Sequence, residues 1–156
     1  MLKILLVSDN HGDVSVLNKV LLQSDFCNIK VHCGDSVMDE EYIKKHFDYA
    51  VRGNNDFNSL PIEQTFSYEK FRFLVIHGDE ITWKRENYFK EFAEYAKKKN
   101  CNVVLHGHMH TIVDTTYDGV RIICPGALMY PRTSVGKTYM ILNVSSSEIN
   151  IFLKML

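Results

Sequence analysis

Residues 3–12 read KILLVSDNHG, a short apolar run that ends in polar residues and a glycine. An uninterrupted apolar run of this length is typical of a strand buried on both faces. The polar loop that follows therefore lies at the end of the strand. Residues 13–24 then carry apolar side chains near helical spacing, with Asp13 as a candidate N-cap. The chain begins with a β-α unit.

The same plan repeats further along the chain. IKVHCGD (29–35) is a strand that ends in Gly-Asp, and EEYIKKHF (40–47) supplies the next helix. DYAVRGNND (48–56) is a third strand, and it ends in glycine and asparagine. Three consecutive strands thus end in acidic or amide residues.

The second half of the chain favours hairpins. TFSYEKFRFLVIHGD (65–79) alternates, TIVDTTYDGVRIIC (111–124) contains an Asp-Gly turn, and residues 136–156 form a last hairpin. Residues 87–100 place their apolar side chains on one helical stripe. CNVVLHGHMH (101–110) is again an apolar strand that ends in a polar loop.

These patterns predict an α/β protein in which two mixed β-sheets pack as a sandwich flanked by helices, in four layers α-β-β-α. The length of 156 residues suits a single domain over residues 1–156. The 18 basic and 19 acidic side chains nearly balance, which gives no strong signal for nucleic acid or for an anionic membrane.

No apolar run approaches the roughly 20 residues of a membrane span, and the N-terminus turns polar too early for a secretory signal. We therefore expect a cytoplasmic protein with no membrane partner. Its four cysteines have no CxxC spacing, so we expect reduced thiols in the core: Cys27, Cys33, Cys101 and Cys124.

Five loops at strand ends carry the candidate functional residues: SDNHG (8–12), HCGDS (32–36), RGNND (52–56), VIHGD (75–79) and HGHMH (106–110). Their side chains offer oxygen and imidazole nitrogen donors, apart from the thiol of Cys33. Such a donor set suits manganese, iron, zinc or nickel. Any single aspartate or histidine here also fits a loop cap or a turn.

The five blocks, in this order, resemble the pattern of the calcineurin-like metallophosphoesterase superfamily: D-x-H, GD, GN-x-D, a lone H and GHxH. The resemblance is closest to its small prokaryotic phosphodiesterases of the YfcE type, and it covers about the whole chain. It implies two divalent metal ions, manganese first, with nickel, iron or zinc as alternatives. It also implies a hydroxide between the two metals that attacks phosphorus in line.

Carried over position by position, the resemblance implies that three residues hold one metal and three hold the other, with Asp35 bridging the two. The first set is Asp9, His11 and His110, and the second is Asn54, His77 and His108. His106 has no role in the pattern, so we expect a core imidazole or one that supports a ligand. We expect His32 and His46 to pack against strands or lie on the surface.

Asn55 stands where many members of the superfamily have a histidine that protonates the leaving oxygen. Because an amide cannot act as a general acid, the sequence favours phosphodiesters over alkyl phosphomonoesters. Asn10 and Arg132 are candidates for contacts with the substrate, and a surface ion pair is an equal alternative for Arg132. Asp56 and Asp79 are candidates for orienting ligand imidazoles or capping turns.

Three rival functions stay open. The first is a protein-binding scaffold of the same fold, like the retromer subunit whose metal site has decayed, and the complete donor set argues against it. The second is a phosphomonoesterase that uses another acid. The third is a nuclease, which the missing basic stripe argues against. We expect a small-molecule phosphodiester as substrate and leave open a homo-oligomer.

Overall fold

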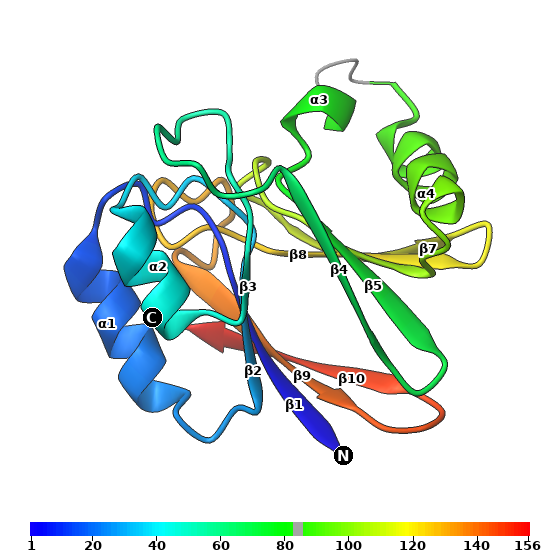
Figure 1. Cartoon of the computed structure of the whole chain (residues 1–156), viewed down its shortest axis with the longest axis horizontal. Helices are drawn as coiled ribbons and strands as arrows, with labels where there is room; N and C mark the ends of the chain where they lie inside the picture. The colour runs from blue at the N-terminus through cyan, green and yellow to red at the C-terminus, as the bar shows by residue number, and fades with distance from the viewer. Residues whose placement is uncertain (83–85) are drawn as a thin grey trace.

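The computed structural model describes residues 1–82 and 86–156, and these form two five-stranded β-sheets with helices on their outer faces (Figure 1). The elements follow in the order β1 (Leu2–Val7), α1 (Val14–Gln23), β2 (Ile29–His32), α2 (Glu40–His46), β3 (Tyr49–Ala50), β4 (Glu63–Tyr68), β5 (Phe71–Ile76), α3 (Asp79–Thr82), α4 (Tyr88–Lys98), β6 (Val103–Leu105), β7 (Ile112–Tyr117), β8 (Val120–Pro125), β9 (Thr138–Val144) and β10 (Ile149–Met155).

The first sheet has the strand order β10-β9-β1-β2-β3. β1, β2 and β3 run parallel, and the C-terminal hairpin adds β9 and β10 antiparallel to them. Helices α1 and α2 pack on the outer face of this sheet, against apolar side chains such as Leu5 and Ile141. The Asp13 side chain caps α1 by accepting a hydrogen bond from the Val16 backbone N–H at 3.0 Å, as the sequence predicts.

The second sheet has the order β4-β5-β6-β8-β7, in which β5, β6 and β8 are parallel and two hairpins form the edges. The β7–β8 hairpin turns at Asp118 and Gly119, whose φ angles of 48° and 79° are those of a two-residue I′-type turn. Helix α4 covers the outer face, where Phe92, Ala93 and Ala96 are buried.

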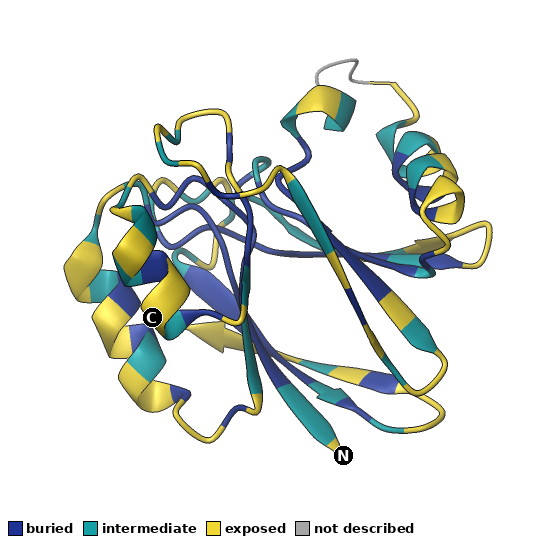
Figure 2. Cartoon of the chain, viewed as in Figure 1, coloured by how far each residue is buried: buried dark blue, intermediate teal, exposed yellow. Residues whose placement is uncertain are grey.

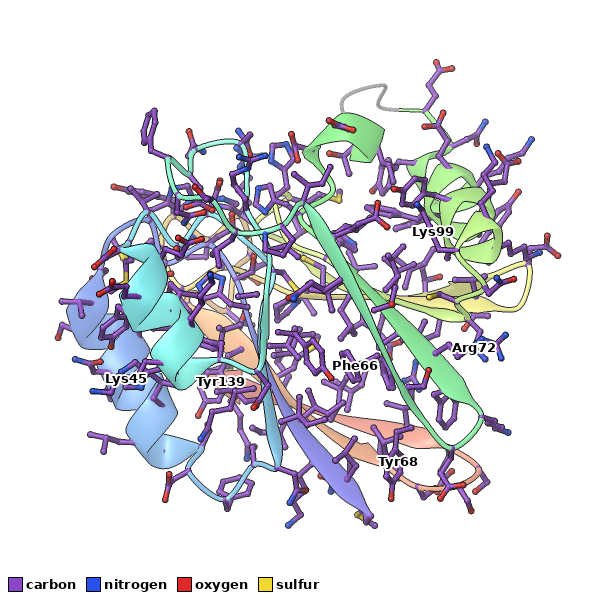
Figure 3. All side chains as sticks on the ribbon, viewed as in Figure 1. Lys45, Phe66, Tyr68, Arg72, Lys99 and Tyr139 are labelled. Carbon is purple, nitrogen blue, oxygen red and sulfur yellow. The ribbon has the colours of Figure 1, made fainter. Side chains whose placement is uncertain are left out.

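The main core lies between the two sheets and is formed by the inward side chains of both (Figure 2). Phe66 lies in this layer (Figure 3), stacked on Tyr49 and Phe73 with ring centroids 4.4 and 4.6 Å away. All four cysteines are buried and free. The predicted sandwich flanked by helices is confirmed. Among the described helices, none has the length and apolar character to cross a membrane.

Two local features differ from the expectations. The third predicted strand is reduced to two residues, Tyr49 and Ala50, because the chain turns away into the loop of residues 51–62. The four-residue helix α3 follows β5 directly and has no counterpart in the sequence predictions, since one helical turn is too short to show a hydrophobic period.

Candidate metal centre

The five loops with candidate ligands follow β1, β2, β3, β5 and β6, and backbone hydrogen bonds join them at one edge of the sandwich. The Asp9 N–H donates to the Gly34 carbonyl at 3.0 Å, which joins the loops of β1 and β2. The Gly107 N–H donates to the His77 carbonyl at 3.0 Å, which joins the loops of β5 and β6. The His108 N–H donates to Oδ2 of Asp9 at 3.1 Å, which joins the loops of β6 and β1, so the donors of both sheets meet at one place.

The first group of donors is Asp9, His11 and His110. The Nε2 atoms of the two histidines lie 3.2 Å apart. Oδ1 of Asp9 lies 3.2 Å from Nε2 of His110 and 3.6 Å from Nε2 of His11. These three side chains can face a single metal ion, as the resemblance implies.

The second group is Asn54, His77 and His108. Oδ1 of Asn54 lies 2.9 Å from Nε2 of His77 and 3.1 Å from Nδ1 of His108. The rings of the two histidines are perpendicular, with centroids 5.1 Å apart. The structure therefore also brings together the second predicted ligand set.

Asp35 lies between the two groups. Its Oδ2 atom is 3.3 Å from Nε2 of His77, in the second group, and 3.8 Å from Nε2 of His11, in the first. Asn55 holds this carboxylate from both ends: its backbone N–H donates to Oδ1 and its side-chain amide donates to Oδ2, each at 2.8 Å. The position of Asp35 agrees with its predicted role as a bridge.

Hydrogen bonds to backbone carbonyls fix the form of two of the imidazoles. Nδ1 of His77 lies 2.8 Å from the Cys33 carbonyl, and Nδ1 of His110 lies 2.8 Å from the Tyr130 carbonyl. Since a carbonyl only accepts, Nδ1 carries the proton in both rings. In the neutral imidazole Nε2 then offers a lone pair toward the cluster, which is the form that binds a metal ion.

One buried atom tests whether a cation fits here. Oδ1 of Asp9 is fully buried and has no hydrogen-bond partner, although a buried carboxylate oxygen normally has one. The nitrogens around it are spaced about as far apart as donors that each lie ~2.1 Å from one ion. The residues present therefore fit a divalent metal on the oxygen and nitrogen donors of both groups.

The charges of the cluster depend strongly on one another. Burial opposes ionisation of Asp9, but the close imidazoles of His11 and His110 outweigh it and hold the pKa of Asp9 well below its usual value. Burial also disfavours the charged form of His77, yet the hydrogen bond to Asp35 and the charge of Asp9 raise the pKa of His77 to about 9. Without metal, the buried carboxylates thus hold a proton on His77.

Five of the seven predicted ligands have left-handed backbone conformations, which residues with a side chain rarely adopt. The φ angles are 58° at Asp9, 41° at His11, 54° at Asp35, 71° at His108 and 56° at His110. Each such residue costs on the order of 1 kcal/mol, and strain of this kind concentrates at functional sites. The loops are thus shaped to bring these side chains together at the expense of backbone stability.

The structure places the other candidates differently. Asn10 is fully buried, and its amide oxygen accepts a hydrogen bond from Nε2 of His32 at 2.8 Å, so its amide is not among the clustered donors. The Arg132 side chain is exposed, and its backbone N–H donates to the His110 carbonyl at 2.9 Å. Buried His106 stacks on Phe92 with a centroid distance of 4.4 Å, in the core position expected of it.

Two further residues support the cluster. Asp56 accepts hydrogen bonds from the backbone N–H groups of Asp35, Val37 and Gly53, so it caps the turns as expected. The buried hydroxyl of Ser8 donates to Oδ2 of Asp9, and Ser8 was not among the residues predicted from the sequence. Ser8 is adjacent to a predicted ligand, which is the one signal the sequence offers for it.

The fold and this cluster agree with the comparisons with known proteins. The family model for the calcineurin-like phosphoesterase superfamily domain matches residues 2–147, and the chain belongs to this family. Over 154 residues it is 30% identical to a "probable metallophosphoesterase" of Mycoplasma pneumoniae, which covers 96% of this chain and 94% of that protein. Membership implies divalent metal ions, and two groups of side chains are candidate ligands by their spacing: Asp9 with His11 and His110, and Asp9 with Asp35 and His77.

Solved structures share the fold at low sequence identity. A conserved protein of Streptococcus pneumoniae, described as a "predicted phosphoesterase", matches with a TM-score of 0.86 and 19% identity over 99% of this chain and 89% of its own. A mutant of Vps29 from Entamoeba histolytica matches with a TM-score of 0.79 and 17% identity, over 99% of this chain and 93% of its own. An archaeal phosphodiesterase matches with a TM-score of 0.71 and 22% identity, over 98% of this chain and 100% of its own.

Proposed function

We propose that this protein is a dinuclear metal-dependent phosphodiesterase in which water attacks phosphorus in line, without a covalent intermediate on the protein. The observation that carries the proposal is the position of Asp35, whose Oδ2 atom faces a histidine of each donor group at 3.3 and 3.8 Å. A carboxylate that contacts two sites suits a pair of adjacent cations. Two bound divalent ions would supply an activated water and neutralise charge on the phosphate.

The protein's own residues define which substrates suit this site. Asn55 occupies the position after the GN pair, and its amide is committed to Asp35 at 2.8 Å. An amide has no acidic proton to give a leaving alkoxide. Diesters with good leaving groups or strained rings need no such proton, so we assign the activity to phosphodiesters. The similarity in fold to an archaeal phosphodiesterase supports this assignment.

The donor set also supports a choice of metal. Six of the seven proposed ligands are carboxylates or imidazoles and the seventh is an amide oxygen, a mixture that suits manganese and also nickel, iron or zinc. We propose manganese as the first choice. The family and the sequence support three further proposals: a small-molecule phosphodiester as substrate, a cytoplasmic location and a homo-oligomer.

The direct test compares an activated diester with an alkyl monoester. With Mn²⁺ or Ni²⁺, purified protein should hydrolyse bis(p-nitrophenyl) phosphate at least about tenfold faster than glycerol 2-phosphate, because the alkoxide leaving group of the monoester needs a general acid, which contributes about 10²–10⁴-fold. A chelator should abolish the activity and added metal should restore it. Equal rates on both esters would contradict the role given to Asn55.

A variant of Asp35 tests the metal pair itself. Asp35→Ala should lose both metal ions, as measured by elemental analysis after dialysis, because it removes the shared ligand. Asp39→Ala is a control that removes an exposed carboxylate at the start of α2, whose side chain makes no cap hydrogen bond. Retention of two metal ions by Asp35→Ala would refute the bridging assignment.

The second candidate function is a protein-binding scaffold, which the similarity in fold to Vps29 favours. A scaffold needs neither the unpartnered oxygen of Asp9 nor a full set of seven donors. The metal-dependent activity described above separates the two candidates, because a scaffold would show no metal-dependent turnover.

A further inference from the structure

A cavity of about 360 Å³ lies beside the Asn54 and His77 half of the metal centre. It is formed by the loop that follows β3, the start of β4, the end of β5 with α3, and Tyr95 of α4 (Figure 1). Volumes of about 300–1,000 Å³ are typical of small-molecule sites. A diester bound at the metal centre therefore has room for one of its two alcohol substituents in this cavity.

The walls of the cavity combine apolar and hydrogen-bonding surface. Ile62, Ile76 and Ile81 supply apolar side chains. Tyr95 adds a ring, and its hydroxyl is hydrogen-bonded to Oε1 of Glu63. Such a surface suits an organic group with a ring or chain and several polar substituents.

Among the lining residues that the structure describes, carboxylates outnumber cations. Glu63 is paired with Lys99, which is not among these lining residues: Oε2 of Glu63 lies 3.4 Å from Nζ of Lys99. Asp79 and Glu80 of α3 add two more carboxylates, and Asp56 a further one that the backbone N–H groups hold. Among the described lining residues, Arg52 is the one permanent cation.

This balance of charge discriminates between possible substituents. A second phosphate in the cavity would lie among carboxylates of the same sign, which is unfavourable even in a partly hydrated site. Hydroxyl groups can donate hydrogen bonds to the same carboxylates, and an ammonium group gains a favourable charge interaction. The walls therefore suit neutral or cationic alcohols.

We propose that this cavity binds one alcohol substituent of the diester and selects an alcohol that carries hydroxyl or ammonium groups over one that carries a further phosphate. The inference rests on the proposed phosphodiesterase function, which supplies the diester. The inference adds a substrate class to that function: diesters of small polyols, nucleosides or amino alcohols, as opposed to nucleotides with additional phosphates.

A pair of chromogenic substrates that differ by one phosphate tests the selection. Thymidine 5′-(p-nitrophenyl phosphate) has a free 3′-hydroxyl, and its 3′-phosphorylated counterpart carries one more phosphate on the same nucleoside. The wild-type protein should favour the former by about fivefold or more in kcat/KM, the effect of about 1 kcal/mol of charge repulsion. A preference for the 3′-phosphate would overturn the proposal and indicate that Arg52 binds phosphate.

A charge reversal shows whether the cavity is responsible. Glu80→Lys should reduce the ratio of the two kcat/KM values by about threefold or more, because it replaces a carboxylate by a cation at the cavity wall. Glu94→Lys is the matched control: it makes the same charge change at an exposed position of α4 that does not line the cavity. An equal ratio in Glu80→Lys and wild type would overturn the proposal.

A binding measurement separates failure of this inference from failure of the proposed activity. Thymidine alone, added to the full chain loaded with Zn²⁺, should shift the backbone amide resonances of Gly78, Ile81 and Tyr95 in ¹⁵N spectra. Shifts at these residues without hydrolysis of any diester would support the cavity and reject the activity. Hydrolysis without such shifts, and without the effect of Glu80→Lys, would reject the cavity alone.

Discussion

At the scale of single residues, two glycines allow the carboxylates to reach the metal centre. A Cβ atom on Gly53 would collide with the Asp35 carboxylate and would lie 2.6 Å from the Asp35 backbone nitrogen. A Cβ on Gly107 would collide with the Ser8 hydroxyl and lie 2.7 Å from Oδ2 of Asp9. The glycines of the GN and GH motifs are therefore needed for close approach to a neighbouring loop.

Gly53→Ala should displace Asp35 and weaken metal binding at least about tenfold, in line with the loss typical when support of a ligand is disturbed. Titration calorimetry with Mn²⁺ on wild type and variant gives the comparison. Gly119→Ala is the control. The φ of 79° at this position strains a residue that has a side chain, while an added Cβ atom would lie in open space. Gly119→Ala should lower stability and leave metal affinity unchanged, and equal losses of affinity in both variants would contradict the argument.

The sequence predicted that the proposed ligands converge, but it did not predict how their neighbours are oriented. Asp9, Asp35 and His77 each come directly after a strand, so their meeting at one edge of the sandwich could be predicted from the order of the elements along the chain. The burial of the Asn10 amide against His32 could not be foreseen, because one residue between two ligands can turn to either side of the loop. The left-handed backbone of the ligands is likewise a result of tertiary packing.

At the scale of elements, strand ends supply the donors and one side chain holds two of the loops together. Asp56, in the loop after β3, accepts backbone hydrogen bonds from Asp35 and Val37 in the loop after β2, at 2.9 and 2.8 Å. It also accepts one from Gly53 at 2.7 Å. Asp56 therefore fixes the distance between the strand ends that carry Asp35 and Asn54.

Asp56→Asn should raise the Mn²⁺ dissociation constant by about tenfold, because an amide NH₂ replaces one oxygen and faces a backbone N–H donor. Asp48→Asn is the control: its carboxylate likewise accepts a hydrogen bond from β2, at the Lys30 N–H, but on the N-terminal side of β2 and β3, whereas the proposed ligands follow their C-terminal ends. Both variants should lose some stability. Wild-type affinity for Mn²⁺ in Asp56→Asn would refute the positioning role.

The long helices and strands could be predicted because their buried apolar residues recur at a regular spacing in the sequence. The short elements could not be predicted in this way. The stripe of Phe92, Ala93 and Ala96 predicts α4, and the alternation around Phe73 predicts the β4–β5 hairpin. β3 and α3 are too short for any period, so their limits come from the loops packed around them. Helix α3 and the loop after β3 also line the cavity beside the metal centre, which the sequence therefore did not reveal.

At the scale of the whole molecule, the metal centre joins the two sheets, since its ligands come from both. Asp9, His11, Asp35 and Asn54 follow strands of the first sheet, and the three other ligand histidines follow strands of the second. Bound metal therefore stabilises the folded sandwich by mass action, by about 2.7 kcal/mol at a metal concentration 100 times the dissociation constant. Without metal, the protonated His77 is a buried counterion of Asp35 and Asp9.

A bound metal ion takes the place of the proton on His77, so the stabilisation of the fold by metal depends on pH. Since the pKa of His77 is raised from 6.5 to about 9 in the metal-free protein, its contribution to stability is complete below pH 6.5 and is lost as pH rises through 9. The loss is at most about 3 kcal/mol. Metal-loaded protein carries no proton at Nε2 of His77, so it escapes this loss and binds metal more tightly as pH rises.

The difference in melting temperature between metal-loaded and chelator-treated protein should therefore widen from pH 6.5 to about 9. Scanning fluorimetry at a fixed metal excess measures this difference. In His77→Gln the titrating group is absent, and the melting temperature of the metal-free form should vary much less over the same range. A difference that is the same at both ends of the range in wild type would show that His77 does not hold the proton that the metal displaces.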